Sequence, residues 1–509
     1  MNIRKLLTRL VSLALIVVFL PTVAMADTWY LEDGSITVSA TDSGQNVSQG
    51  GVTKADSAPV IRNRDSSAST TNNVTIRADT GATANVTLED TNIDTTGGAG
   101  PNGAGDAAVR TDGAGNVNLN VELDNTLQSG NTHAGVEKGN GGNLTIGSES
   151  GSGQLVAVGG HRGAGIGSGN GYETGIHDVG NITITGGDIF AIGNGGGAGI
   201  GGGWESDATD ITITGGNVTA EARQEGPQHV GGAGIGGGGY QNKYYGNGTN
   251  IKITGGHVTA IGGNCSAGIG GSMYSDGENI SISDAEVIAV GGTGSAGIGG
   301  GNGGGEGKNI SISGSANVKA AGGEGENQIG KGAAIGSGGT NSYQGGPVID
   351  AAEGKADTSG LSPGGSVERL DPGTTFDIPQ PKPRSSFPKP TPDPVAVEEE
   401  PQPVKAALYR VIDETGKALP VETKQEDGVL LLAAQADIAI LEGAISGLQT
   451  LQSRGIDTIT FTNGTISVSF SLAEVIAKGA SSDVYRLTLS GGEANFTLAD
   501  ADITALLGK

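Results

Sequence analysis

The sequence predicts a mainly β protein, in which a parallel β-helix is followed by a proline-rich linker and a small α+β domain. Three observations predict this class. Glycine contributes 96 of the 509 residues, far above the usual share of roughly 7%, a glycine-punctuated segment recurs along the chain, and prolines cluster late in the sequence. In chain order we expect an export signal at 1–26, the β-helix at 27–350, the linker at 351–403 and the α+β domain at 404–509.

The first 26 residues have the pattern of an export signal. Arg4, Lys5 and Arg9 form a basic start, an apolar run covers residues 10–20, and Ala24-Met25-Ala26 is a small-x-small cleavage site. The apolar run is too short to favour a membrane-spanning helix, and no later segment approaches about 20 apolar residues. We therefore expect a secreted mature chain that begins at Asp27, has no transmembrane segment, and is extracellular or held non-covalently at a cell surface.

A repeat defines the next region. The segments NITITGGDIFAIG at 181, DITITGGNVTAEA at 210, NIKITGGHVTAIG at 250, NISISDAEVIAVG at 279 and NISISGSANVKAAG at 309 are each followed by AGIGG or a close variant. A degenerate copy begins at Asn143, and weaker ones at Asn116, Asn85 and Asn73. The unit is therefore about 29 residues long with insertions, which is typical of a solenoid of stacked coils. Residues 29–69 are expected to cap its N-terminal end.

Apolar and polar residues alternate within each unit, as in short strands. Ile182 and Ile184 would point inward while Thr183 and Thr185 point outward, and the isoleucine of AGIGG supplies a third strand. Glycine suits the corners because it adopts positive φ without steric cost. Outward Thr-x-Thr rows could also bind ice, but the later coils lose them, and outward threonine is ordinary strand chemistry.

The composition changes at about residue 371. Ten of the 17 prolines fall between Pro372 and Pro403, which predicts a semi-rigid extended linker. Beyond it, the pattern predicts strands at 409–412, 466–470 and 485–489. A helix is expected over 438–455, and a second one from a Ser471/Glu474 capping box to Gly479. Nothing in this domain has a catalytic pattern.

The ITITGG…VTAIGG…AGIGGG units resemble the glycine-rich repeats of secreted surface proteins from anaerobic Gram-positive bacteria. More loosely, they resemble the clostridial carbohydrate-binding β-helix proteins related to pectate lyases. The resemblance covers about residues 70–345. It implies a right-handed coil, surface exposure and binding of an acidic polysaccharide with Ca²⁺. The calcium-binding aspartates of the family cannot be placed on this chain, so the metal ligands stay unassigned. The C-terminal domain loosely resembles modules of other clostridial surface proteins.

Aromatic residues recur in the loop that follows AGIGG. Equivalent loops of a solenoid lie above one another, so these rings would form a column suited to an extended glycan, because a ring offers an apolar face and a polar tip. The alternative is that the rings fold back and cover the flank of the solenoid itself. The predicted carbohydrate-binding residues are Tyr172, Trp204, Tyr240, Tyr244, Tyr245 and Tyr274.

Carboxylates accompany these aromatic residues, and loop oxygens of this kind could ligate Ca²⁺. Their spacing matches no defined calcium loop, so a solvated acidic surface is the favoured interpretation and no cofactor is assigned. The acidic residues concerned are Glu173, Asp178, Glu205, Asp207, Asp210, Asp276 and Glu278.

Charge and composition narrow the function further. A net charge of −25 disfavours nucleic-acid binding, and the single cysteine, Cys265, excludes an internal disulfide. The candidates for catalysis, His161-Arg162, His177-Asp178 and His229, are more typical of polar loop positions. We therefore expect a non-catalytic protein that binds extracellular polysaccharide, with the C-terminal domain available to a cell-surface protein. A structural adhesin or fibre without sugar affinity, and a polysaccharide lyase or hydrolase, remain the alternatives.

Overall fold

The computed structural model describes residues 27–97, 105–171, 178–223, 230–239, 246–326, 328–342, 346–382, 409–414, 419, 421–426, 428–434, 436–453, 456–479, 483–490, 492–499 and 501–508. The predicted export signal, residues 383–403 of the predicted linker and residues 404–408 of the predicted α+β domain lie outside this part. The chain divides into two compact units, Met1–Thr391 and Pro392–Lys509. In the described residues, no helix is long and apolar enough to cross a membrane.

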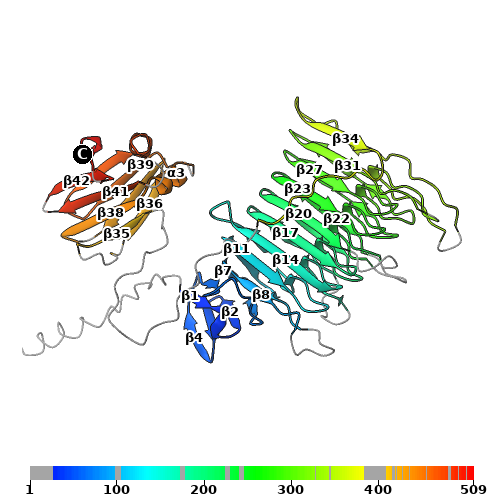
Figure 1. Ribbon diagram of the computed structural model, residues 1–509, viewed down its shortest axis with the longest axis horizontal. Helices are drawn as coiled ribbons and strands as arrows, with labels where there is room; N and C mark the ends of the chain where they lie inside the picture. Colours follow the sequence, from blue (N-terminus) through cyan, green and yellow to red (C-terminus); the bar gives the residue numbers. More distant parts are fainter. Residues whose placement is uncertain are drawn as a thin grey trace, which may run out of the picture. The chain divides into compact units, whose positions relative to one another are not determined.

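The first unit is a β-helix, as predicted. Each coil contributes one strand to each of three sheets, and the strands of successive coils pair in parallel. In Figure 1 they stack as rungs that run from blue to yellow. Sheet 1 holds β1(Thr28–Tyr30), β5(Val60–Arg62), β7(Thr83–Glu89), β10(Asn116–Glu122), β13(Leu144–Gly147), β16(Ile182–Ile184), β19(Ala208–Ile213), β22(Gly248–Ile253), β26(Ser281–Ser283), β30(Ile310–Ser313) and β33(Ala356–Asp357), with the short β25(Gly277–Glu278) and β29(Gly307–Lys308) beside them.

Sheets 2 and 3 complete each coil. Sheet 2 holds β8(Asn92–Asp94), β11(Asp124–Gln128), β14(Gln154–His161), β17(Asp188–Asn194), β20(Asn217–Arg223), β23(His257–Ile261), β27(Glu286–Val290), β31(Asn317–Ala321) and β34(Ser366–Leu370). Sheet 3 holds β2(Ile36–Thr41), β3(Gly44–Gln49), β4(Val52–Ala55), β6(Val74–Ala78), β9(Val109–Gly113), β12(Val136–Lys138), β15(Ile166–Gly167), β18(Ile200–Gly201), β21(Ile235–Gly236), β24(Ile269–Gly270), β28(Ile298–Gly299) and β32(Ile335–Gly336).

The core is a set of aliphatic columns in strict register. Ile200 pairs with Ile235, and Ile235 with Ile269, each fully buried. Ile182 and Ile184 are buried as well, while Thr183 between them is half-buried and points outward. A buried aliphatic side chain contributes roughly 1.5–3 kcal/mol, and stacking gives each coil two neighbours to bury it against. The predicted alternation and stacking are therefore confirmed.

A polar ladder lies where each repeat begins, inside β19 and β22 and just before β26 and β30. Asp210, Asn250, Asn279 and Asn309 all have φ between 51° and 54°, a left-handed conformation that asparagine and aspartate tolerate better than most residues. Asn309 donates its side-chain N–H to Asn279 Oδ1 at 3.0 Å, and Asn279 donates to Asn250 Oδ1 at 3.1 Å. The asparagine that opens a repeat thus accepts a hydrogen bond from the equivalent asparagine of the next coil.

The N-terminal end differs from the coils, as expected. Strands β2, β3 and β4 form an antiparallel meander, and only β2 pairs with a coil strand, β6, in parallel. One detail of the predicted repeat is wrong. The copy suspected at Asn73 would place Val74 and Ile76 in the first sheet, but β6 pairs with β9 in sheet 3. The Val-Thr-Ile alternation is the same in any of the three sheets, so it cannot assign the phase of the repeat.

The solenoid also continues beyond the predicted boundary at residue 350. Strand β33 pairs with β30, and β34 pairs with β31 over five residues. This last turn has no ITITGG signature. Strands β33 and β34 are the end strands of their sheets, so they tolerate polar residues such as Glu368. The predicted start of the linker at 351 is therefore corrected to about residue 371.

The described residues of the second unit form two sheets and two short α-helices around one core, in agreement with the predicted α+β class. One sheet has the order β35(Arg410–Ile412), β38(Ile438–Ala444), β41(Val484–Ser490), β42(Glu493–Leu498), β43(Ala501–Asp502). The other has the order β36(Val421–Glu426), β37(Val429–Ala434), β39(Thr458–Thr462), β40(Ser467–Ser471). The helices are α3(Ile445–Ser453) and α4(Leu472–Ile476).

Two expectations for this unit are wrong in part. The helix predicted over 438–455 is a strand up to Ala444, because β38 pairs along its full length with β41 and also with β35. Ser471 is the N-cap of α4, but its side chain makes no capping hydrogen bond. The predicted strands at 409–412, 466–470 and 485–489 are confirmed within one residue at each end.

Candidate functional site

The loops that follow the third-sheet strands stack as predicted, and their geometry decides where the aromatic rings lie. In two of these loops the third residue after the strand donates its backbone N–H to a carbonyl in an adjacent loop: Trp204 to Arg162 at 3.0 Å and Asn302 to Cys265 at 3.1 Å. Trp204, Met273 and Asn302 occupy this position, and each is at most 5% exposed. The position therefore faces the interior of the loop stack rather than solvent.

Trp204 is covered by its neighbours. The Arg162 guanidinium lies 4.0 Å from the centre of the indole ring, and the His161 ring centre lies 6.4 Å away. With 5% exposure, the indole offers no open face to a sugar. Arg162 and Trp204 form a cation–π pair of the kind that is worth about 0.5–2 kcal/mol.

Tyr274 also packs on the flank of the solenoid. It lies one position later in its loop, at φ 60°, and is half-buried against a satellite cluster that includes Cys265 and Met273. Its hydroxyl donates to Asn341 Oδ1 at 2.8 Å, and Asn341 donates to Asn302 Oδ1 at 2.7 Å. The two described members of the predicted platform thus follow the alternative in which rings cover the loops.

The other four platform residues lie outside the described residues: Tyr172, Tyr240, Tyr244 and Tyr245. Two of the candidates for catalysis, His177 and His229, lie outside as well. Carbohydrate binding at these tyrosines therefore stays a prediction.

The acidic residues of the loops form a ladder between coils. Asp207 Oδ1 accepts the backbone N–H of Asn247 at 2.6 Å, and Asp276 Oδ1 accepts that of Glu306 at 2.8 Å. Burial, and to a lesser degree Asp178, raises the pKa of Asp207. Lys308 donates to Asp276 Oδ2 at 2.5 Å. These carboxylates tie one coil to the next, and among the described residues no three His, Cys, Asp or Glu side chains converge as a metal site.

A buried charged cluster lies near the middle of the solenoid, and the sequence analysis did not anticipate it. Glu137 is completely buried and bonds Arg110 Nη1 at 2.9 Å and His133 Nδ1 at 2.7 Å. The next residue, Lys138, is 4% exposed and donates to Asn140 O at 2.6 Å, and burial lowers its pKa to about 8. The i, i+4 spacing of His133 and Glu137 was the available sequence signal. Arg110 and His133 compensate the buried charge of Glu137, which gives that pair of contacts a structural role.

The outward face of sheet 1 carries in-register rows of amides and hydroxyls. Strand pairing aligns one row as Asn85, Asn118, Thr145, Thr183, Thr212. The neighbouring row runs Thr87, Asn120, Gly147 and is continued by Thr185.

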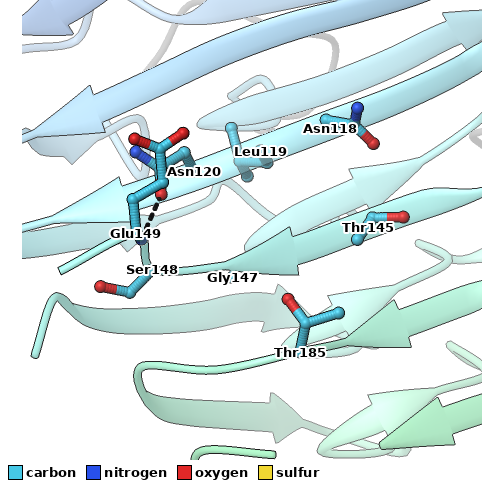
Figure 2. Close-up of a pocket in the computed structure, with 8 residues that line it drawn as sticks. All are labelled: Asn118, Leu119, Asn120, Thr145, Gly147, Ser148, Glu149 and Thr185. Atoms are coloured by element: carbon cyan, nitrogen blue, oxygen red, sulfur yellow. Dashed lines mark hydrogen bonds between the residues drawn. The ribbon is translucent and has the colours of Figure 1, made fainter. Parts of the chain in front are cut away.

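A hollow lies in the second row at Gly147, where the Thr185 hydroxyl approaches the glycine so closely that a Cβ would lie 2.3 Å from it. The hollow holds about 190 Å³, is open to solvent, and lies between the side chains of Asn120 and Thr185 (Figure 2). Glu149 closes one end, because its backbone N–H donates to Asn120 Oδ1 at 2.9 Å. The lining residues are Asn118, Leu119, Asn120, Thr145, Gly147, Ser148, Glu149 and Thr185.

Comparison with known proteins agrees with the fold. A family model described as a beta helix repeat matches residues 182–204, 211–239 and 251–273. These segments run from the first-sheet strands β16, β19 and β22 into the loops that follow β18, β21 and β24, so the matches cover three complete coils. No curated protein and no solved structure shows a significant match. The first unit is thus a β-helix by both its geometry and its repeats.

Proposed function

We propose that this protein is a secreted, non-catalytic β-helix protein that binds an extracellular polysaccharide. The observation that carries the proposal is the solvent-open hollow at Gly147 on the outward face of sheet 1. It is bordered by amides and hydroxyls, which both donate and accept hydrogen bonds as sugar hydroxyls do. The aligned rows on either side would let a chain molecule continue past the hollow along the solenoid.

The charge of the protein narrows the class of glycan. Glu149 is an exposed carboxylate at the hollow, and the whole chain carries a net charge of −25. An acidic polysaccharide would be repelled unless a cation intervened, and among the described residues no carboxylate group of three is available to hold one. A neutral or amino-sugar polymer is therefore the ligand that the hollow favours.

The test is a glycan array with the full-length chain, followed by affinity measurements on any ligand found. A Thr185→Ala/Glu149→Ala variant removes two polar groups of the hollow. Each hydrogen bond contributes about 0.5–1.5 kcal/mol, so the loss of two should lower the affinity roughly 5- to 150-fold. Ser281→Ala/Ser311→Ala removes hydroxyls from the same face in distant coils and should bind like the unaltered protein.

A third variant, Tyr240→Ala/Tyr244→Ala/Tyr245→Ala, tests the predicted aromatic loops separately. Loss of affinity in this variant alone would move the binding site to those loops. Binding to no glycan would refute the proposal and favour the adhesin or fibre, and release of an ultraviolet-absorbing unsaturated product would establish a lyase instead.

A further inference from the structure

Sheet 2 has an unexpectedly apolar outward face. Ile189 and Ala191 of β17 point into the core, so Phe190 and Ile192 point outward, yet they are only 8% and 7% exposed. Thr219 in the next strand points outward as well and is 6% exposed. Outward side chains are shielded to this degree only if something covers the sheet.

The segment at 373–382, called the strap, follows β34, and its two ends are bonded to different strands of sheet 2. At its start, Gly373 donates its N–H to Gly322 O at 2.9 Å, just past β31. At its end, Lys382 bonds Gln154 in β14 and Asp188 in β17. Five strand spacings of about 4.8 Å separate β31 from β14, or about 24 Å, and nine extended residues span about 30 Å. The strap therefore crosses the face in an extended conformation.

The far end of the strap is held by a specific set of contacts. The Gln154 side chain pairs with both main-chain groups of Lys382: its Nε2 donates to Lys382 O at 3.2 Å, and its Oε1 accepts the Lys382 N–H at 2.8 Å. Asp188 accepts from Lys382 Nζ at 2.6 Å and from Asn217 Nδ2 at 2.7 Å. Gln154 thus binds the backbone of an extended peptide, and Asp188 binds the ammonium group of a lysine.

The strap is weakly attached between its two ends. Thr374 and Phe376 are half-buried and Thr375 is exposed, as expected for an extended segment with one side against a sheet, whereas residues 377–380 are all exposed. It lies on the face of the sheet rather than at an edge, so it cannot join the backbone ladder. Its connection to β34 is the short turn at 371–373, where Gly373 has φ +79°.

We propose that the outward face of sheet 2 is a self-association surface, which binds the strap of a second copy of this chain in exchange for its own. The contacts at Gln154 and Asp188 fix the occupant: an extended, proline-containing segment with a lysine at its end, which every copy carries. Exchange needs a new conformation only in the turn at 371–373, and the contacts formed are the same in both arrangements. Protein concentration then decides between them.

The experiment mixes equal amounts of natural-abundance and nitrogen-15-labelled full-length protein and couples close amine–carboxylate pairs with a carbodiimide. Mass spectrometry of the digested product then reports whether the cross-linked Lys382 and Asp188 come from one copy or two. We expect mixed-isotope cross-links that increase with protein concentration toward about half of the total. The Lys308–Asp276 pair, 2.5 Å apart within the solenoid, is the internal control and should never be mixed.

Two results would overturn the proposal. If the 188–382 cross-links carry a single isotope at every concentration, the strap does not exchange. If the control pair couples and the 188–382 pair does not, the strap does not dock. The Asp188→Asn variant should lose this cross-link and keep the control, which verifies its assignment.

Discussion

Replacement of Gly236 by alanine tests the stacking on which the β-helix depends. Gly236 follows the buried Ile235 and has φ +139°, and a Cβ placed there would lie 2.0 Å from the carbonyl oxygen of Gly270 in the next coil. That atom belongs to the backbone and cannot rotate away. Alanine therefore forces either a new backbone conformation or a wider separation of the two coils.

The cost follows from the local geometry. A strained φ at a residue with a side chain costs about 1–3 kcal/mol. Separation of the coils also stretches the bonds from Ile235 N to Gly268 O, 2.9 Å, and from Gly237 N to Gly270 O, 3.1 Å. Each weakened bond adds about 0.5–1.5 kcal/mol. We expect the free energy of unfolding to fall by about 2–6 kcal/mol.

Urea denaturation followed by tryptophan fluorescence measures this loss. Both tryptophans of the chain, Trp29 and Trp204, lie in the first unit, so the signal reports the solenoid alone. Gly186→Ala is the matched control, because its Cβ would meet nothing closer than 3.8 Å, and its effect should stay within about 0.5 kcal/mol. Equal midpoints for the two variants would refute close backbone contact between coils.

Three further predictions concern buried side chains. Cys265 is 2% exposed, and burial raises its pKa to about 12. A thiol reagent at pH 8 should therefore modify it only when urea unfolds the protein. Rapid labelling of the folded protein would contradict the buried placement of this thiol. Burial lowers the pKa of His133, but its bond to Glu137 outweighs this and holds the pKa above 6.5. The stabilisation from the His133–Glu137 pair is therefore complete below about pH 6.5 and is lost as the pH rises through the folded-state pKa. NMR titration of His133 in the unaltered protein and in Glu137→Gln checks the pairing. A His133 pKa that this substitution leaves unchanged would contradict it. Trp204→Ala should lower the free energy of unfolding by about 3–5 kcal/mol, and Arg162→Ala should lower it by about 0.5–2 kcal/mol, both measured by circular dichroism. A Trp204→Ala variant as stable as the unaltered protein would mean that the indole is not packed.

The candidate site shows where sequence reasoning reached its limit. The repeat correctly placed Trp204 and Tyr274 in equivalent loops, but not the direction of either side chain. Their positions after the third-sheet strand differ by one residue, and in a tight loop one residue separates the interior of the stack from its surface. The hollow at Gly147 was equally hidden, because it forms between residues from three coils.

The strand β38 makes the same point in the second unit. Ile438, Leu441 and Ile445 have helical spacing, yet Ala439 and Leu441 are fully buried in a strand. Local periodicity fits both conformations in so apolar a segment. Pairing with β41 and β35 selected the strand, since strands far apart in the chain supplied the hydrogen bonds.

By itself, the sequence determined the β-helix, its repeat length and the inward set of isoleucines, because these depend on alternation and on glycine at corners, which are local properties. Only the tertiary structure decided which rings are covered, which face is hollowed, and that a proline-rich segment lies back across sheet 2. Each of these depends on side chains from different coils, and their proximity arises only when the coils are stacked.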